Sequence, residues 1–327
     1  MDILSGMKQR RGVKLNYDVI GDIHGQSEKF EALLQKLGYV PMGSGYRAPQ
    51  DHQLVLLGDL IDRGPGQMRV LEIARSMVDG GDAICIMGNH EFNAIAYVTD
   101  DPYHHGEALR PNRGESDKCH KNRAQHAEFL AQVGEGTVAH REWVQWFRTL
   151  PPFLELDGIR AVHGCWDQAS VDVLRESGWG AGKPLKNPLL VEVANRKTPV
   201  RRARQLLLCG LEIPLSQGHY ILDKAGHRHS DVRIANWRHW GRTLGDVALV
   251  PKGQEELLAH LDWPAGLVLS AIEGSPVFVG HHWFSGHPVI ESQKLACLDW
   301  SSAAGGPQVA YRWSGEEELS NDKLIWV

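Results

Sequence analysis

The sequence predicts a mixed α/β fold that contains a largely parallel sheet. Apolar runs of strand length alternate with segments of helical periodicity, and the runs end in polar turns that contain glycine. This alternation is typical of parallel sheets, because two parallel neighbours need a crossover connection between them. The apolar fraction of 42% and the charged fraction of 23% are those of an ordinary globular protein.

The first half of the chain shows the alternation most clearly. The expected elements are, in order, a strand at 17–20, a helix at 27–38, a strand at 53–57, a helix at 67–78 and a strand at 83–87. In the first helix Phe30, Leu33 and Leu34 recur at helical spacing, and Gly38 suits its C-terminal cap.

The second half is less regular. The expected elements are a helical stretch over 122–150 that Pro151-Pro152 stops, strands at 153–156 and 159–162, and strands at 276–280, 294–300 and 308–313, the last two as antiparallel neighbours. Between them, residues 165–275 carry several prolines, the segment NWRHW and a basic run. We therefore expect a single catalytic domain over 1–327, with 165–275 as an insertion or cap.

The charge and the cysteine content of the chain indicate its cellular compartment and exclude some classes of partner. The formal net charge is only −5, so nothing global attracts the chain to nucleic acid or to anionic lipid. The five cysteines are odd in number and never form a Cys-x-x-Cys pair, which favours a reducing compartment. The first residues have a basic stretch but no apolar signal-peptide core, and no window reaches membrane-spanning length. We expect a cytoplasmic protein with neither a membrane nor a nucleic acid as its partner.

Five polar clusters follow apolar runs, where strands are expected to end. They are Gly21-Asp22-Ile23-His24-Gly25, Gly58-Asp59-Leu60-Ile61-Asp62-Arg63-Gly64, Gly88-Asn89-His90-Glu91, His163-Gly164 and Gly280-His281-His282. Ligand sites of open α/β sheets lie at the carboxyl ends of strands, and glycines let the backbone approach a ligand closely. Histidine, aspartate and asparagine without thiolates suit a catalytic site for Mn²⁺, Fe or Zn²⁺. Taken singly each cluster could be an ordinary turn, so the prediction rests on the set.

These blocks resemble the calcineurin-like metallophosphoesterase superfamily, in a bacterial branch near the phosphoprotein phosphatases and the symmetrical diadenosine tetraphosphatases. GDIHG, GDLIDRG and GNHE stand in the family's order and at its spacing, and a later His-Gly and Gly-His each follow an expected strand. The resemblance covers 17–91 closely, then only short blocks near 159–164 and 278–313. It implies two facing β-sheets flanked by helices, the αββα sandwich of that family, with an inserted cap region.

The resemblance also implies the site and its chemistry. It implies two divalent metal ions, which are most simply Mn²⁺, with Fe or Zn²⁺ as alternatives. Asp22 and His24 would bind the first ion, and Asp59 would bridge the two. The ligands of the second ion would be Asn89, His163 and His281. His90, oriented by Asp62, would protonate the leaving oxygen, and Arg63 would clamp the phosphoryl oxygens. A hydroxide formed on the metals would attack in line.

Three departures from the family pattern mean that the family's reaction can be carried over to this chain, but not its substrate. Met87 precedes GNHE where many phosphoprotein phosphatases carry arginine, the motif at 163 reads His-Gly-Cys, and the insertion is large. We expect a dinuclear phosphatase that hydrolyses phosphomonoesters, with phosphoserine or phosphothreonine of a protein among them. The alternative is a symmetrical hydrolase of diadenosine tetraphosphate, so the partner is a phosphorylated protein or a nucleotide. A third hypothesis is a metal-bearing scaffold without turnover, against which the complete ligand set argues.

Further residues carry weaker expectations. His282 is expected to support the site or the core rather than to bind metal, since Gly-His-His lacks the spacing of a Gly-His-x-His motif. The tryptophans at 166, 237, 240 and 283 are expected mainly in the core, with nucleobase stacking as the alternative. The arginines at 110, 113, 123, 201, 202 and 204 are candidates for a second phosphate contact, although most are expected at the surface. The cysteines are expected as buried apolar residues.

Overall fold

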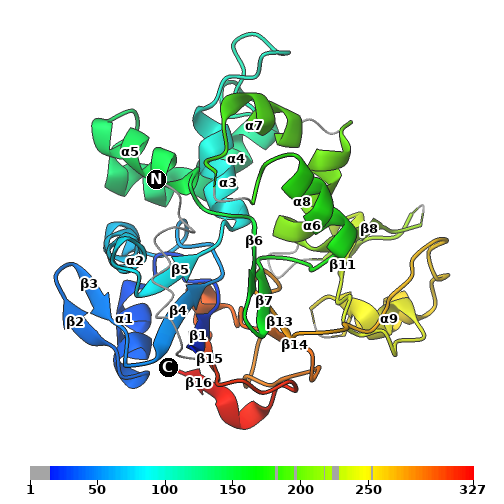
Figure 1. Ribbon diagram of the computed structural model, residues 1–327. Coiled ribbons are helices and arrows are strands. Elements are labelled where there is room, and N and C mark those ends of the chain that lie inside the picture. The colour runs from blue at the N-terminus through cyan, green and yellow to red at the C-terminus, as the bar shows by residue number, and fades with distance from the viewer. Residues whose placement is uncertain (1–14, 181–182, 195–196, 217, 223–227, 252) are drawn as a thin grey trace.

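A five-stranded sheet combines three strands from the first third of the chain with two from its end. The computed structural model describes residues 15–180, 183–194, 197–216, 218–222, 228–251 and 253–327. The strand order is β16-β15-β1-β4-β5 (Figure 1), formed by Leu324–Trp326, Val309–Trp313, Asn16–Ile20, His52–Leu56 and Ala83–Cys85. Strands β1, β4 and β5 are parallel, whereas β15 runs antiparallel to both β1 and β16. The carboxyl ends of the three parallel strands therefore meet at one edge of this sheet.

A second sheet of four strands faces the first. Its order is β14-β13-β7-β6, formed by Leu295–Cys297, Val277–Val279, Ile159–Val162 and Phe153–Leu156. Strand β13 is parallel to β7 and β14, and β6 pairs with β7 in an antiparallel hairpin. A buried cluster joins the sheets, because Val55 of β4, Phe278 of β13 and Tyr311 of β15 belong to the same apolar core. The rings of Phe278 and Tyr311 lie 5.2 Å apart across the interface.

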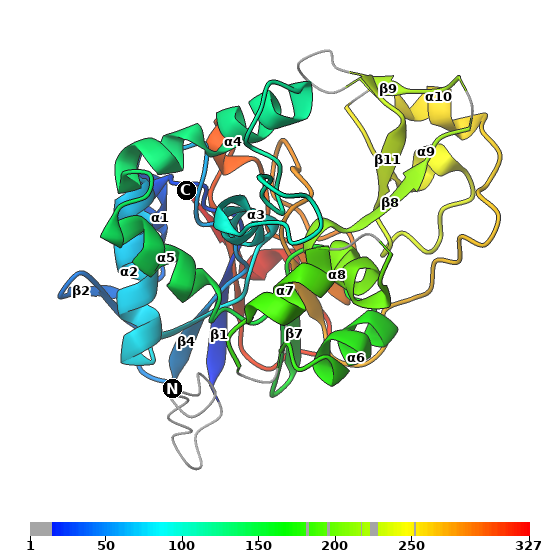
Figure 2. The same cartoon turned by 90° about the horizontal axis from the view of Figure 1, so that it is seen from above.

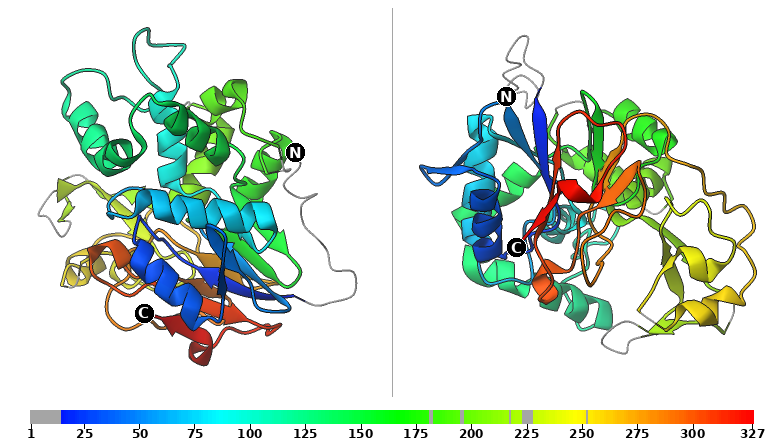
Figure 3. Two further views of the ribbon diagram at one scale, coloured as in Figure 1. Left: turned by 90° about the vertical axis from the view of Figure 1, so that its left-hand side faces the viewer. Right: turned by 90° about the horizontal axis from the view of Figure 1, so that it is seen from below.

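Alternate residues of β4 show how the layers form. Val55 points into the core between the sheets, whereas Leu54 and Leu56 belong to the core under the helices. Side chains of a strand alternate between its two faces, so a strand of continuous apolar residues is one that is covered on both sides. Figure 3 shows helices α1 (Ser27–Lys36) and α2 (Gln67–Gly80) lying over the outer face of the first sheet. The structure thus has the predicted arrangement of two facing sheets flanked by helices.

Three helices follow β5. They are α3 (Asn89–Val98), α4 (Asp117–Val133) and α5 (Val138–Phe147), and a short hairpin of β2 (Val40–Met42) and β3 (Gly45–Arg47) lies beside α2. The expected helical stretch over 122–150 is wrong in two respects, because it forms two helices and the first of them begins earlier, at Asp117. Gly134 ends α4 with a φ of 76°, and the side chain of Thr137 accepts the His140 N–H to cap α5.

The described part of the segment between β7 and β13 forms helices and two small sheets of its own. It contains α6 (Gln168–Glu176), α7 (Asn187–Ala194), α8 (Pro199–Cys209), β8 (Leu211–Pro214), β9 (Ile221–Leu222), β10 (Arg228–His229), β11 (Asp231–Ile234), α9 (Leu244–Val247), β12 (Ala248–Leu249) and α10 (Glu255–Ala259). Strands β12, β11 and β8 form one sheet with a separate apolar cluster around Val232 and Ile234. Figure 2 shows this sheet with α9 and α10 to one side of the two main sheets.

Two expectations about the strands are corrected by the pairing. The first sheet is mixed and not largely parallel, because β15 returns beside β1 in the opposite direction without a crossover helix. The strands expected at 294–300 and 308–313 are not neighbours, since β14 belongs to the second sheet and β15 to the first. The chain crosses between the sheets through the short 3-10 helix Ser302–Ala304.

In the described part of the chain, none of the helices has both the length and the apolar character that crossing a bilayer requires.

Candidate metal centre

The predicted site residues all follow strands, and they lie at the carboxyl ends of parallel neighbours in the two sheets. Asp22 and His24 follow β1, Asp59, Asp62 and Arg63 follow β4, Asn89 and His90 begin α3 after β5, His163 follows β7 and His281 follows β13. Because β1, β4 and β5 are parallel, and β7 and β13 are parallel, the fold gathers these five turns at one end of the sandwich.

Backbone hydrogen bonds fix the turns against one another. The His24 N–H donates to the Asp59 carbonyl at 2.8 Å, and the Gly280 N–H donates to the His163 carbonyl at 2.9 Å. Gly58 has a φ of 88°, and a Cβ there would lie 2.3 Å from the backbone nitrogen of Gly88. Only glycine therefore permits the contact between the turns after β4 and β5.

Left-handed backbone is concentrated here. Among the described residues that are not glycine, eight have positive φ, and six of them belong to this site or its rim: His24, Asp59, Asp62, Arg63, His281 and Trp283. Each such residue costs on the order of 1 kcal/mol or more, and the surrounding packing holds it in place. The local strain aims these side chains into one volume.

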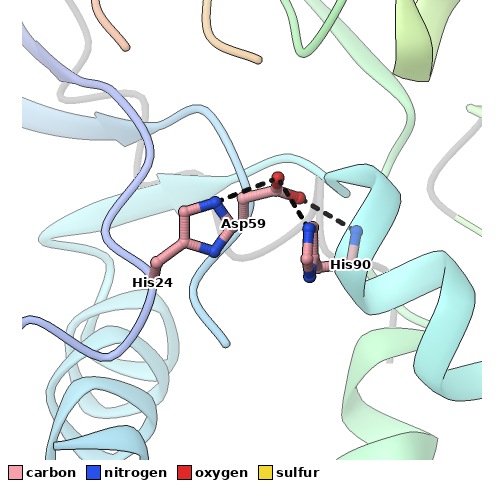
Figure 4. A group of neighbouring side chains, drawn as sticks. All are labelled: His24, Asp59 and His90. Atoms are coloured by element: carbon pink, nitrogen blue, oxygen red, sulfur yellow. Dashed lines mark hydrogen bonds and ion pairs between the residues drawn. The ribbon is translucent and has the colours of Figure 1, made fainter. Parts of the chain in front are cut away.

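Asp59 lies at the centre of the site. Its Oδ2 atom lies 3.6 Å from His24 Nε2 and 3.8 Å from His90 Nε2 on one side, and 3.2 Å from His163 Nε2 on the other. Figure 4 shows the first group, with the rings of His24 and His90 on either side of the carboxylate. His24, Asp59 and His90 offer ligand atoms within 4.8 Å of one another, and so do Asp59, His163 and His281. One carboxylate is thus shared by two potential metal sites.

Asp22 and Asn89 complete the two groups. Asp22 Oδ2 lies 3.9 Å from His24 Nε2, and the Asn89 Oδ1 atom lies 3.1 Å from His163 Nε2. The His281 N–H donates to the Asp22 carboxylate at 3.1 Å, which joins the turns after β1 and β13. Distance alone also places His90 in the first group, although the resemblance assigns it to proton transfer.

Hydrogen bonds to carbonyl oxygens orient two of the histidines. His24 Nδ1 donates to the Ile61 carbonyl at 2.8 Å, and His163 Nδ1 donates to the Leu57 carbonyl at 2.7 Å. The Nε2 atom of each ring then faces Asp59, as in metal sites where a second hydrogen bond fixes the orientation of the ring. Burial, followed by the charges of His90 and Arg63, lowers the pKa of His24 to about 3, so its ring is neutral.

The chemistry of the donors fits divalent cations. His24 Nε2 and both ring nitrogens of His281 are buried without a hydrogen-bond partner. Burial lowers the pKa of His163, but Asp59 and then Asp22 outweigh it and raise the value to about 10, so the carboxylates attract positive charge to this point. Buried imidazoles beside buried carboxylates, with no thiolate in either group, suit Mn²⁺, Fe or Zn²⁺.

The side chain of His90 is hydrogen-bonded to that of Asp62. The His90 Nδ1 atom donates to Asp62 Oδ2 at 2.5 Å. Burial lowers the pKa of His90, but the charge of Asp59 and the hydrogen bond to Asp62 outweigh it, so the net pKa is raised. The other oxygen of Asp62 accepts from His126 Nδ1 at 2.8 Å. His126 was missed in the sequence; its spacing to Phe129, Leu130 and Val133 on α4 marks a buried face, but not a contact with Asp62.

Two buried carboxylates support the site and were also missed. Glu91, at the start of α3, accepts the N–H groups of Gly88, Asp59 and Leu60 at 3.0, 2.9 and 2.8 Å. Asp299, after β14, accepts the Trp283 N–H at 2.8 Å. Glu91 belongs to the GNHE motif, whereas Asp299 was hidden in a segment expected to be strand.

Arg63 is exposed at the rim of the site and stacks on Trp283. Its guanidinium carbon lies 3.9 Å from the centre of the indole ring. Trp283 is 46% exposed, and Trp240 is 60% exposed, whereas Trp166 and Trp237 are buried as expected. The His282 Nε2 atom donates to the Gly164 carbonyl at 3.0 Å, and its ring packs on Trp237, which places it beside the site without joining either cluster.

The arginines considered for a second phosphate contact lie in different parts of the structure. Arg110 donates to Gln125 at 2.5 Å, and the Gln125 side chain lies 3.4 Å from His90 Nε2, so Arg110 is linked to the site. Arg204 is buried over the ring of Phe92, while Arg113 and Arg123 line a different pocket. All five cysteines are free, and all except Cys209 are fully buried, as expected.

Comparison with curated proteins finds relatives that match a part of this chain. A protein of Anoxybacillus flavithermus named bis(5'-nucleosyl)-tetraphosphatase PrpE (asymmetrical) is 42% identical over 74 residues, which cover 23% of this chain and 30% of the relative. The protein of the same name from Bacillus subtilis is 31% identical over 106 residues, which cover 32% of this chain and 43% of the relative. The chain thus spans less than half the length of these relatives.

Comparison with solved structures extends over almost the whole chain at low identity. A serine/threonine phosphatase of Saccharomyces cerevisiae is 13% identical with a TM-score of 0.46, covering 97% of this chain and 80% of that one. A cold-active tyrosine phosphatase of a Shewanella species is 18% identical with a TM-score of 0.42, covering 96% and 78%. The family model described as calcineurin-like phosphoesterase matches residues 15–179, which is half of the chain. The chain therefore belongs to the calcineurin-like phosphoesterase family.

Proposed function

We propose that the protein is a dinuclear, metal-dependent phosphatase that acts on phosphomonoesters. The observation that carries the proposal is the position of Asp59, whose carboxylate belongs to both clusters of ligand atoms. Asp22 and His24 would hold the first ion with Asp59. Asn89, His163 and His281 would hold the second, with Mn²⁺ the best fit and Fe or Zn²⁺ as alternatives. Bound metals supply a nucleophile at neutral pH and screen the charge of the phosphoryl group.

The residues around the metals would bind and protonate the substrate. Arg63 is exposed at the rim, where its planar fork can donate to two phosphoryl oxygens. His90 is held by Asp62 in the tautomer that leaves Nε2 facing the site, from which it would donate a proton to the leaving oxygen. Arg110, linked to His90 through Gln125, is the second arginine that we assign to the phosphate. It would bind the phosphate in place of the arginine that many phosphoprotein phosphatases carry at the position of Met87.

Steady-state hydrolysis by the Mn²⁺-loaded protein tests this proposal. The substrates are p-nitrophenyl phosphate, a phosphopeptide, diadenosine tetraphosphate and a cyclic nucleotide. We expect turnover of the monoesters that falls by at least about 10³-fold in Asp59→Asn, because a bridging ligand is lost. Asp18→Asn is the matched control: Asp18 is also buried and also accepts from a histidine, His52, but lies in the middle of β1 and not in the turn that follows it. An unchanged rate in Asp59→Asn would refute the assignment.

A second candidate is hydrolysis of a dinucleoside polyphosphate. The names of the PrpE relatives favour it, and Trp283 offers an exposed ring at the rim on which a base could stack. Product analysis separates the forms of this activity. Two equal diphosphates would indicate the symmetrical reaction, which was the alternative considered from the sequence. A monophosphate with a triphosphate would match the asymmetrical reaction in the relatives' name. A metal-loaded protein inert on every substrate would instead support a scaffold.

We also retain two proposals about the chain as a whole. The first is that residues 1–327 form one catalytic domain with 165–275 inserted as a cap, since the elements of that segment connect β7 to the adjacent strand β13. The second is a cytoplasmic location, which rests on the five unpaired thiols. The partner there would be a phosphoprotein or a nucleotide.

A further inference from the structure

A pocket of about 760 Å³ lies beyond the C-terminal end of α3, between that helix, α4 and α5. Its lining includes Tyr97, Arg123, His140 and Arg148, and it contains none of the residues assigned to the metals, to proton transfer or to the phosphate clamp. The helices that enclose it lie together at the top of Figure 1. The pocket is therefore separate from the metal centre.

Positive charge is concentrated in this pocket. Four arginines line it, at 113, 123, 141 and 148, against two carboxylates, at 100 and 135. Arg113 pairs with Asp100 at 2.8 Å. The hydrogen bonds of Arg123, Arg141 and Arg148 with other described residues go to carbonyl, amide, hydroxyl or imidazole groups, and none goes to a carboxylate.

Two buried donors of the lining lack an acceptor. They are Arg148 Nε and His140 Nε2. His140 Nδ1 accepts the Gly136 N–H at 3.1 Å, so the neutral ring carries its proton on Nε2. Burial, followed by the charges of His126 and Arg141, lowers the pKa of His140, which keeps the ring neutral. A buried donor left unpaired costs about 1–3 kcal/mol, so a ligand whose binding shifts either side chain and brings an acceptor oxygen to the donor would stabilise the pocket.

We infer that this pocket binds a phosphate-bearing small molecule and that its occupation is transmitted to the catalytic His90. Guanidinium forks match phosphate oxygens, and several of them together select a multiply charged ligand. The volume is that of a site for a small organic molecule and exceeds what a single phosphate ion fills. A compound of nucleotide size with two or more phosphates fits both the charge and the space.

The path to the metal centre is short and fully packed. The ring of Tyr97, in the pocket wall, lies 5.1 Å from the ring of His126. His126 donates to one oxygen of Asp62, and His90 donates to the other. A ligand that moves Tyr97 therefore shifts the side chain that orients His90, because a close-packed interior transmits displacement. This second part of the inference rests on the proposed role of His90 as acid, whereas the binding itself does not.

Binding is tested with α,β-methylene adenosine diphosphate, which a phosphoesterase cannot cleave between its phosphates. Equilibrium dialysis with the Mn²⁺-loaded protein is done in an Asp59→Asn background, which weakens the metal centre. We expect one site, whose affinity falls at least about tenfold on adding Arg148→Gln or the exposed Arg141→Gln. The matched control is Arg160→Gln, since Arg160 is also partly buried and bonded to backbone carbonyls but lies outside the pocket. Equal affinity in all these variants, or no binding, overturns the inference.

Transmission is tested by kinetics in the wild-type background. Competition at the metal centre raises KM for p-nitrophenyl phosphate and leaves kcat unchanged, whereas occupation of the pocket should change kcat. We expect a change in kcat of at least about twofold with the probe, absent in Arg148→Gln and present in Arg160→Gln. Binding without any effect on kcat refutes the transmission and leaves the binding. A protein that binds the probe but turns over no phosphoester refutes the proposed function alone.

Discussion

Replacing Asp62 with asparagine tests how the proton donor works. In the structure Asp62 accepts from His90 at 2.5 Å and from His126 at 2.8 Å, and all three side chains are buried. A hydrogen bond between charged partners contributes about 1.5–3 kcal/mol, and one pKa unit corresponds to about 1.4 kcal/mol. Losing the negative charge should therefore lower the pKa of His90 by about 1–2 units.

The sign of the pH effect follows from the role of His90. The acid must be protonated to act, and its pKa in the folded protein is raised, so activity should persist above the usual titration range of histidine and then fall. In Asp62→Asn the alkaline limb of kcat should move down by about 1–2 units. At a pH above both limbs, the rate should be about 10- to 100-fold lower than in the wild type.

Leaving-group dependence makes the assay specific. A poor leaving group such as phenol needs the proton more than p-nitrophenol does, so the loss of kcat should be larger on phenyl phosphate. The same measurements on Asp18→Asn control for the loss of a buried carboxylate, since Asp18 accepts from Tyr39 and Arg312 away from the metals. Equal losses on both substrates, with an unmoved alkaline limb, would refute the reasoning that Asp62 acts through His90.

Three further substitutions test the supports of the site. In Gly280→Ala the new Cβ would lie 2.1 Å from Asp22 Oδ1, so the affinity for Mn²⁺, measured by calorimetry, should fall by about 10- to 100-fold; unchanged affinity would contradict the close approach. Glu91→Gln would turn an amide toward backbone N–H groups, and urea unfolding should show a loss of about 1–3 kcal/mol. Trp283→Ala removes the ring under Arg63 and should raise KM about 2- to 5-fold with little change in kcat; a fall in kcat alone would argue against this role.

The parallel strands before residue 91 and the turns that follow them could be predicted closely because their sequence signals are local, whereas the short hairpin of β2 and β3 was not expected. Each apolar run ends at a glycine, which the turn needs for its positive φ at Gly58 and for close approach of other atoms at Gly21 and Gly88. The expected strand at 53–57 differs from β4 by one residue at each end. The pairing of the late strands could not be predicted in this way. Both β14 and β15 are buried on their two faces, so neither shows the alternation that would tell which sheet it joins.

The supports of the site were harder to predict than the ligands. Ligands stand in motifs, whereas His126 reaches Asp62 from a helix 64 residues further along the chain. Nothing in the spacing of α4 distinguishes His126 from His140 on α5, which is equally buried but bonds to Gly136. Such contacts depend on the packing of helices, which the local pattern does not encode.

The order in which the strands join the two sheets has a consequence for synthesis on the ribosome. Asp22, His24 and Asp59 emerge early, but His163 reaches the Leu57 carbonyl across 106 residues and the His281 N–H reaches Asp22 across 259. Such distant contacts close late, because the chain must first pay the entropy of the long loops between them. A nascent chain therefore presents half of a metal centre, open to any divalent ion in its surroundings. The second cluster, and with it selection of the metal pair, can form only after strand β13 has been released and docked beside β7.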